Sequence, residues 1–223
     1  MRRRSALLLL TLVPLAGCGA SGSAEPLASA GTSADYAWPA RNADLTSGFC
    51  FTLVRGLTEH QITKRLGGDD LERVDWNRVV RPGDGEAGAR KRFFMGIGRV
   101  GNWSVIVEDN GTLGVTRELV KSLSKNRGEV LAYRGGGGEP GRLVVFRNGD
   151  LALDLDTSAP DRLGGNKPDQ FRPTLQATGL LGGPAVTDPT ASALAFMAAR
   201  SGVTLTAQVM QQLEYLLVEV PQA

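Results

Sequence analysis

The middle third of the chain alternates short apolar runs with tight-turn signals, and no other feature constrains its fold as much. Residues 93–108 contain two such runs around a Gly-Asn pair at 101–102, and residues 142–156 contain two around an Asn-Gly pair at 148–149. Glycine and asparagine tolerate the positive φ that a two-residue hairpin turn requires. Both segments therefore predict antiparallel hairpins.

Helical patterns surround these hairpins. Thr58 and Gln61 match a capping box, while Asp188, Pro189 and Gly202 match the start and end of a late helix. Strands are expected at 48–55 and 128–133. Helices are expected at 57–66, at 71–80, at 116–126, after Asp188, and from Thr206 until Pro221, while 160–184 reads as irregular. Strands and helices without strict alternation indicate an α+β fold. We expect a mainly antiparallel sheet built from hairpins and packed by helices, including a C-terminal helical pair.

The N-terminus reads as a secretory signal. Arginines occupy positions 2–4, and an apolar run covers 6–16 with Pro14 inside it. That length suits the apolar part of a signal peptide. It is too short to cross a bilayer, which requires roughly 20 apolar residues.

Residues 15–18 read Leu-Ala-Gly-Cys and match the bacterial lipobox. The resemblance implies cleavage after Gly17 and lipidation of Cys18, with acyl chains such as palmitate. The alternative is an ordinary signal peptide with a chance cysteine at its end. The lipobox interpretation divides the chain into a signal peptide at 1–17, a flexible lipidated tether at 18–34 and one globular α+β domain at 35–223. It places the protein at the cell membrane, lipid-anchored on the extracytoplasmic face.

Net charge and cysteine content limit which binding partners and which covalent bonds the chain can have. The chain has 25 Lys and Arg and 23 Asp and Glu, a formal net charge of +2. Removal of the three arginines at 2–4 leaves 22 basic and 23 acidic residues, a net charge of −1. A near-neutral domain argues against nucleic acid. Lipidation would leave Cys50 as the remaining cysteine. It could be a reactive thiol or form an intermolecular disulfide, but we expect a small buried side chain.

The chain also resembles an uncharacterised family of actinobacterial proteins. The resemblance rests on residues 48–57, on the hairpin at 98–105 with Glu108, Asn110 and Gly111 after it, and on 202–206. It covers roughly residues 35–217. It implies a high-GC Gram-positive source, which fits the preference for arginine over lysine, and it carries no activity.

Two glycine-rich segments invite a nucleotide or anion interpretation. Residues 96–101 match G-x-G-x-x-G, but that motif requires a helix after it, whereas a strand pattern follows here. The glycines at 135–138 could cradle an anion, yet no Lys-Ser/Thr follows them as in a P-loop. We interpret the first segment as a strand and its turn, and the second as a flexible hairpin loop.

Acidic side chains supply another candidate site. Asp150, Asp154 and Asp156 alternate with leucines, which predicts that their carboxylates share one strand face. These carboxylates could hold calcium or serve as an acid–base pair. A solvated outer face explains the same pattern.

His60 is the chain's only histidine and has no metal-ligand partner at helical spacing. A Ser-His-Asp hydrolase would need it, but no G-x-S-x-G segment is present to supply the serine. Trp38, Trp76 and Trp103 could stack on cell-wall sugars; core packing is the better interpretation for Trp103. A basic triplet at 90–92 could touch anionic headgroups or simply end a solvated loop.

These observations favour a non-enzymatic binding or interaction domain, with no catalytic, cofactor-binding or metal-binding residue assigned. The expected partners are the lipid membrane, through acylated Cys18, and a protein of the envelope, with nucleic acid excluded. The alternative is a cell-envelope hydrolase that uses Asp154, Asp156 and Asp161.

Replacement of Cys18 by Ala or Ser should release the protein from the membrane or leave its precursor uncleaved. The physical reason is that the thiol is the only group at the lipobox that can form a thioether to diacylglycerol, and two or three acyl chains are needed for stable attachment. Fractionation of cells into membrane and soluble material, with the mass of the N-terminus, checks this. An unchanged membrane-bound, processed protein would contradict the lipobox interpretation.

Overall fold

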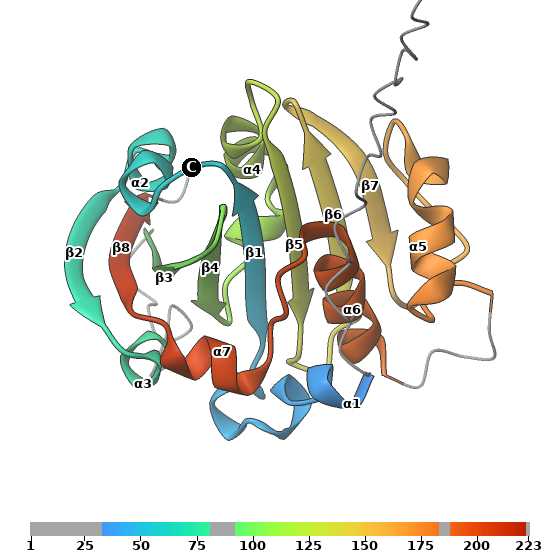
Figure 1. The fold of residues 1–223 in the computed structure, drawn as a ribbon, viewed down its shortest axis with the longest axis horizontal. Helices are drawn as coiled ribbons and strands as arrows, with labels where there is room; N and C mark the ends of the chain where they lie inside the picture. The colour runs from blue at the N-terminus through green and yellow to red at the C-terminus, as the bar shows by residue number, and fades with distance from the viewer. Residues whose placement is uncertain (1–32, 81–91, 183–187, 222–223) are drawn as a thin grey trace, which may run out of the picture.

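The computed structural model describes residues 33–80, 92–182 and 188–221, which build an eight-stranded sheet with helices on both faces (Figure 1). The strand order is β2-β8-β3-β4-β1-β5-β6-β7, and every neighbouring pair is antiparallel. The strands are β1 (Phe49–Arg55), β2 (Asp69–Val74), β3 (Arg92–Val100), β4 (Trp103–Asp109), β5 (Glu129–Gly135), β6 (Arg142–Arg147), β7 (Asp150–Asp156) and β8 (Tyr215–Pro221). The predicted α+β fold with a mainly antiparallel sheet is confirmed.

The described residues also form seven α-helices and four 3-10 turns. The helices are α1 (Ser33–Tyr36), α2 (Glu59–Leu66), α3 (Trp76–Val79), α4 (Arg117–Leu123), α5 (Arg172–Ala177), α6 (Pro189–Ser201) and α7 (Ala207–Gln212). The 3-10 turns are Pro39–Arg41, Ala43–Leu45, Leu113–Val115 and Pro168–Phe171.

The predicted helix signals are confirmed where a cap is encoded locally. Thr58 and Gln61 form both hydrogen bonds of the capping box at the start of α2. Asp188 accepts from the backbone N–H of Ala191 at 2.8 Å at the start of α6, and Gly202 ends that helix with a φ of 74°. The positive φ suits glycine, which has no Cβ to clash.

The sheet separates two apolar cores. Because side chains alternate along a strand, Leu53 and Val54 of β1 point to opposite faces. Leu53 belongs to the core beneath α5 and α6, and Val54 belongs to the core beneath α2 and α4. In Figure 1, α6 and α7 lie in front of the sheet and α4 lies behind it. The strand predicted at 48–55 is therefore a central one, buried on both faces.

Two predicted helices are wrong in part. The first, at 71–80, is β2 followed by the short α3, and the helix expected from Thr206 to Pro221 stops at Gln212 and continues as β8. β8 inserts between β2 and β3 and hydrogen-bonds to both. The pairing partners of β8 lie more than a hundred residues earlier, so local periodicity does not reveal them, and tertiary pairing overrides helical spacing. The segment expected to be irregular, 160–184, contains the Pro168–Phe171 turn and α5.

A buried carboxylate joins the end of β4 to the 3-10 turn that follows it. Glu108 is fully buried, and its two oxygens accept from the backbone N–H groups of Leu113 at 3.0 Å and Gly114 at 3.1 Å. Charged acceptors make stronger hydrogen bonds than neutral ones. The contact holds the turn Leu113–Val115 against the sheet, where Leu113 enters the α2–α4 core.

Glycine is required around this carboxylate. A Cβ on Gly111 would lie 2.2 Å from Oε1 of Glu108, and a Cβ on Gly114 would lie 2.0 Å from Oγ1 of Thr52. Asn110 donates its backbone N–H to the Gly48 carbonyl at 2.9 Å and has a φ of 55°. The residues that carried the family resemblance near 108–111 therefore form a structural junction between β1, β4 and the turn.

Replacement of Glu108 by Gln should lower the free energy of unfolding by about 2 kcal/mol. A neutral amide offers one acceptor oxygen instead of two, so one buried N–H loses its acceptor and the other keeps only an uncharged one. Hydrogen bonds to charged groups contribute roughly 1.5–3 kcal/mol. Urea unfolding followed by circular dichroism measures the change. The control Glu118→Gln, at an exposed position of α4, should stay within about 0.5 kcal/mol; equal losses in the two variants would contradict the assignment.

Candidate functional site

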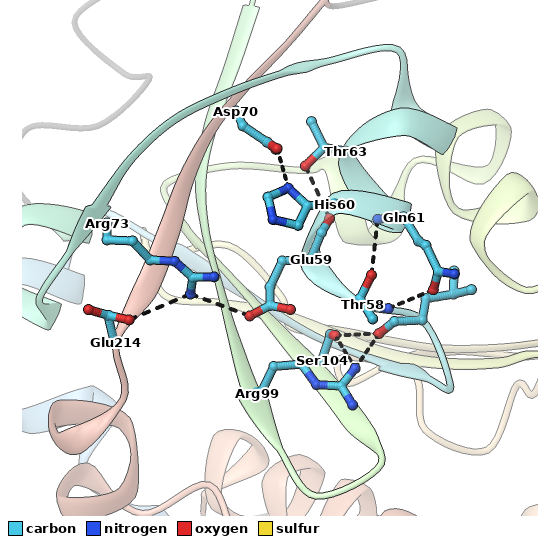
Figure 2. Close-up of polar contacts among 11 residues, drawn as sticks. Thr58, Glu59, His60, Gln61, Thr63, Asp70, Arg73, Arg99, Ser104 and Glu214 are labelled. Atoms are coloured by element: carbon cyan, nitrogen blue, oxygen red, sulfur yellow. Dashed lines mark hydrogen bonds and ion pairs between the residues drawn. The ribbon is translucent and has the colours of Figure 1, made fainter.

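The only histidine lies in a polar cluster where α2, β2, β3 and the start of β8 meet (Figure 2). Nδ1 of His60 contacts Oδ2 of Asp70, which ties the first turn of α2 to β2. Arg73 of β2 lies between two carboxylates, 3.4 Å from Glu59 and 3.7 Å from Glu214. The side chains of the cluster come from segments that are separate in sequence, and together they attach the edge strand to the helix.

The lower part of the cluster fixes the loop between β1 and α2. Arg99 donates to the Leu57 carbonyl at 2.6 Å and to Ser104 Oγ at 3.2 Å, and the Ser104 hydroxyl donates to the same carbonyl at 2.6 Å (Figure 2). Ser104 is fully buried. Its hydroxyl is therefore committed to the backbone and is not positioned as a nucleophile for His60.

Electrostatics at Asp70 favour the ion pair. Burial works to raise the pKa of Asp70, but hydrogen bonds from Thr63 and His60 and the positive charges of His60 and Arg73 outweigh it and hold the pKa below its ordinary value. Within the described residues, no serine, threonine or cysteine hydroxyl or thiol is hydrogen-bonded to His60. The arrangement can orient an imidazole, but its evident effect is to attach α2 to the sheet.

The predicted acidic face is only partly assembled. A register shift leaves Ala152 without a partner in β6, because Val145 pairs with Leu153 while Phe146 pairs with Leu151. Opposed residues share a face of a sheet, so Asp150 lies on one face while Asp154 and Asp156 lie on the other. The prediction that the three carboxylates share one face is therefore wrong for Asp150, because the bulge at Ala152 reverses the order in which side chains alternate.

The remaining aspartates are occupied or exposed. Asp154 accepts two hydrogen bonds from Arg142, from Nε at 2.9 Å and from Nη2 at 2.7 Å. Asp156 accepts from the hydroxyl and the backbone N–H of Ser158, and these bonds hold the pKa of Asp156 below its ordinary value. Asp161 is exposed. A general acid requires a raised pKa, so this arrangement favours ion pairing over acid catalysis.

A hollow of about 670 Å³ brings Asp156 together with the end of the glycine loop. Its lining carries three arginines, from β5, β6 and α4, and three acidic residues, so its charge is mixed. Its lining residues are Thr112, Val115, Thr116, Arg117, Glu118, Arg134, Glu139, Pro140, Gly141, Arg142 and Asp156.

A second hollow, of about 420 Å³, is lined by two of the three tryptophans singled out in the sequence. Trp38 and Trp76 pack edge to face, with ring centroids 5.7 Å apart, and Trp38 also stacks on Phe51. Nε1 of Trp38 donates to the Leu205 carbonyl at 2.8 Å, which fixes the ring. The polar lining residues are Arg41, Asn42, Asp44, Asn77 and Gln211. The sequence singled out the tryptophans, but only folding brought two of them together.

Several other residues singled out in the sequence pack in the interior of the domain. Trp103 packs in the core beneath α6, as expected. Gly96 lies inside β3, where a Cβ would come within 2.6 Å of Val79 Cγ2, so this glycine permits close packing of α3. Cys50 is buried as predicted, and burial, with the negative charge of Glu108, raises the pKa of its thiol well above the ordinary value. Cys18 and the basic residues at 90–91 lie outside the described residues.

Metal and membrane signals are lacking in the described ranges 33–80, 92–182 and 188–221. No three His, Cys, Asp or Glu side chains gather there in a way that could hold a metal ion. In the same ranges, none of the helices combines the length and the apolar character that a membrane crossing requires.

Comparison with known proteins adds one match. A family model described as a family of unknown function (DUF6461) matches residues 29–223. The prediction of an uncharacterised family is thereby confirmed. No curated protein and no solved structure matches the chain.

The ion pair at Asp70 predicts a pH-dependent contribution to stability. Because the pKa of Asp70 is lower in the folded state than its ordinary value of 3.8, its contribution is present above that pH and is lost as the pH falls through the folded-state pKa. Asp70→Asn should therefore lower the free energy of unfolding near neutral pH by about 0.2–1 kcal/mol, the range for exposed pairs. The difference from wild type should vanish in acid.

Urea unfolding at a series of pH values measures this difference. Asp161→Asn, at an exposed position whose carboxylate forms no hydrogen bond or ion pair in the described part of the chain, is the matched control and should leave the curve unchanged. A pH-independent loss in Asp70→Asn would contradict the ion-pair explanation.

Proposed function

The chain belongs to the family of unknown function that matches it over residues 29–223, and we propose that it is a lipid-anchored binding protein of the cell envelope. In this proposal, Cys18 carries the acyl chains, a tether follows it, and the folded domain binds a saccharide in the hollow beside Trp38 and Trp76. The observation that carries the binding function is this hollow. In it the half-buried Trp38, backed by the buried Trp76, lies with three amide side chains and one pair of oppositely charged side chains.

The anchor is supported by the N-terminal sequence. Residues 15–18 have the lipobox pattern, and the family match begins at residue 29, beyond the cysteine. Each buried methylene of an acyl chain contributes about 0.8 kcal/mol, so two or three chains hold a protein at a membrane almost permanently. The anchor would place the domain at the extracytoplasmic face, where cell-wall saccharides are abundant.

The lining of the hollow suits a neutral polyhydroxylated ligand. Ligand sites combine apolar or aromatic surface with a few polar groups that fix orientation. Asn42, Asn77 and Gln211 carry amides that both donate and accept hydrogen bonds, as sugar hydroxyls require. Arg41 and Asp44 carry opposite charges, so the lining has no net charge to favour an ion.

The alternative function is a cell-envelope hydrolase that uses Asp154, Asp156 and Asp161. Its support is the position of Asp156 at the larger hollow. The bidentate contact of Asp154 with Arg142 and the lowered pKa of Asp156 count against it, because a hydrolase needs a carboxyl group that can give up a proton near neutral pH. A binding protein requires no such group.

Calorimetric titration of the full-length protein in detergent with the β-1,4-linked trimer of N-acetylglucosamine tests the proposal. The trimer should bind, and Asn77→Ala or Gln211→Ala should each weaken binding about 2- to 10-fold, as expected for one lost neutral hydrogen bond. Both side chains are exposed, so folding should be unaffected.

Gln212→Ala is the matched control, because Gln212 is also exposed and adjacent to Gln211 in α7 but does not line the hollow. Its affinity should equal that of wild type. Absence of binding, or equal effects of the two glutamine substitutions, would overturn the saccharide proposal.

A further inference from the structure

Three arginines converge on one carboxylate at the end of the sheet where β1 and β6 finish. Glu129 begins β5, Arg147 lies opposite it in β6, and Arg55 lies one residue beyond the Val54–Val130 pair in β1. These side chains share the face that α6 covers, and Arg200 reaches them from the last turn of α6. The four residues are called the Glu129 cluster below.

The distances show how unequally the carboxylate is shared. Oε1 of Glu129 accepts from Arg147 Nε at 2.8 Å and from Nη2 at 2.6 Å. Arg200 Nη2 is 3.6 Å from the same oxygen, and Arg55 Nη1 is 3.8 Å from Oε2. Only Arg147 makes a close contact, so the other two guanidinium groups are held near the carboxylate but are not saturated by it.

The charge of the cluster is uncompensated. One carboxylate faces three guanidinium groups, which always carry a proton, so the cluster has a net charge of +2. Asp150 lies opposite Arg147 in β7 but forms no ion pair with it in the described part of the chain. The buried Nε of Arg200 has no hydrogen-bond partner among the described residues. A buried donor without a partner is costly.

Aromatic rings hold the guanidinium groups in place. The guanidinium carbons of Arg147 and Arg200 lie 5.2 Å and 5.5 Å from the ring centre of Phe171, and that of Arg55 lies 6.0 Å from the ring centre of Trp103. Cation–π contact with a ring leaves the N–H edges of a guanidinium free to donate. The arginine side chains are 57%, 35% and 28% exposed for Arg55, Arg147 and Arg200, against 9% for Glu129. Solvent therefore reaches the positive groups and hardly reaches the negative one.

We propose that Arg55, Arg147 and Arg200 form a binding site for a phosphate group. Guanidinium groups match phosphate oxygens with paired N–H donors, and two surplus charges suit a doubly charged oxyanion. The phosphate would accept from the solvent-exposed N–H groups of Arg55 and Arg200, while Glu129 keeps Arg147 in position. The site is separate from the Trp38–Trp76 hollow and does not depend on saccharide binding. A phospholipid headgroup and a soluble phosphate compound carry the same chemistry.

Calorimetric titration of the full-length protein in detergent with inorganic phosphate, at constant ionic strength set with chloride, is the first test. Phosphate should bind and chloride should not compete. Arg55→Gln and Arg200→Gln should each weaken binding about 10- to 100-fold, as expected for the loss of charged hydrogen bonds. Arg78→Gln, at a 68%-exposed arginine of α3 that pairs with Glu72 and is not a member of the cluster, is the matched control and should bind as wild type.

Glu129→Gln separates a binding site from a purely structural ion network. Removal of the negative charge raises the surplus to +3, so phosphate affinity should increase, whereas a structural network predicts lower stability with no phosphate binding. If Glu129→Gln does not fold, the Arg55→Gln result decides alone, because Arg55 is more than half exposed and its replacement leaves the core intact.

A second titration with dihexanoyl phosphatidylglycerol, below its micelle concentration, distinguishes the sources. Binding of both probes, with phosphate displacing the lipid, indicates a headgroup site. Binding of phosphate alone indicates a soluble phosphate compound. Each result supports the proposal. Binding of neither probe at millimolar concentration, or equal affinity in wild type and Arg55→Gln, would overturn it.

Discussion

The hydrogen bonds from Leu113 and Gly114 to the buried Glu108 carboxylate are the contact on which the centre of the structure depends. A carboxylate removed from water requires compensating donors, and the two backbone N–H groups supply them at 3.0 and 3.1 Å. The turn can approach this closely only because Gly111 and Gly114 have no Cβ. This turn places Leu113 in the core under α2 and α4. The negative charge of Glu108 also helps to keep the thiol of Cys50 protonated.

Most of the side chains that could take part in catalysis instead form contacts that stabilise the fold. His60 and Arg73 attach the edge strand β2 to the start of α2, and Ser104 fixes the loop before that helix (Figure 2). Asp154 holds Arg142 across β6 and β7. The contacts of His60, Arg73 and Asp154 involve the edge strands β2 and β7. An edge strand has backbone hydrogen bonds on one side only, so side-chain contacts add to its attachment. The groups that remain available are those at the two hollows and in the Glu129 cluster, so binding is a better interpretation of this domain than catalysis.

Sequence reasoning succeeded where structure is encoded by near neighbours. The two hairpins, the capping box of Thr58 and Gln61, and the ends of α6 depend on residues within four positions of one another, and all are present. It failed for β2 and β8, whose strand character comes from mutual pairing between residues 69–74 and 215–221. It also failed for the face of Asp150, because an unpaired Ala152 reverses the side-chain alternation and no residue type marks that bulge. The Glu129 cluster could not be predicted from the sequence, because its four members are spread from residue 55 to residue 200.

The sequence by itself determined the antiparallel hairpins, the helix caps, the near-neutral charge of the chain beyond its N-terminal arginines, and the lipobox pattern at residues 15–18 on which the proposed anchor rests. Each depends on local order along the chain or on composition, which need no fold to be interpreted. Only the tertiary structure decided that Trp38 meets Trp76, that Glu108 closes the turn after β4, and that Arg55, Arg147 and Arg200 surround one glutamate. The physical reason is that these meetings follow from strand order and from which face of the sheet each side chain takes, and both are set by long-range pairing rather than by neighbours in sequence.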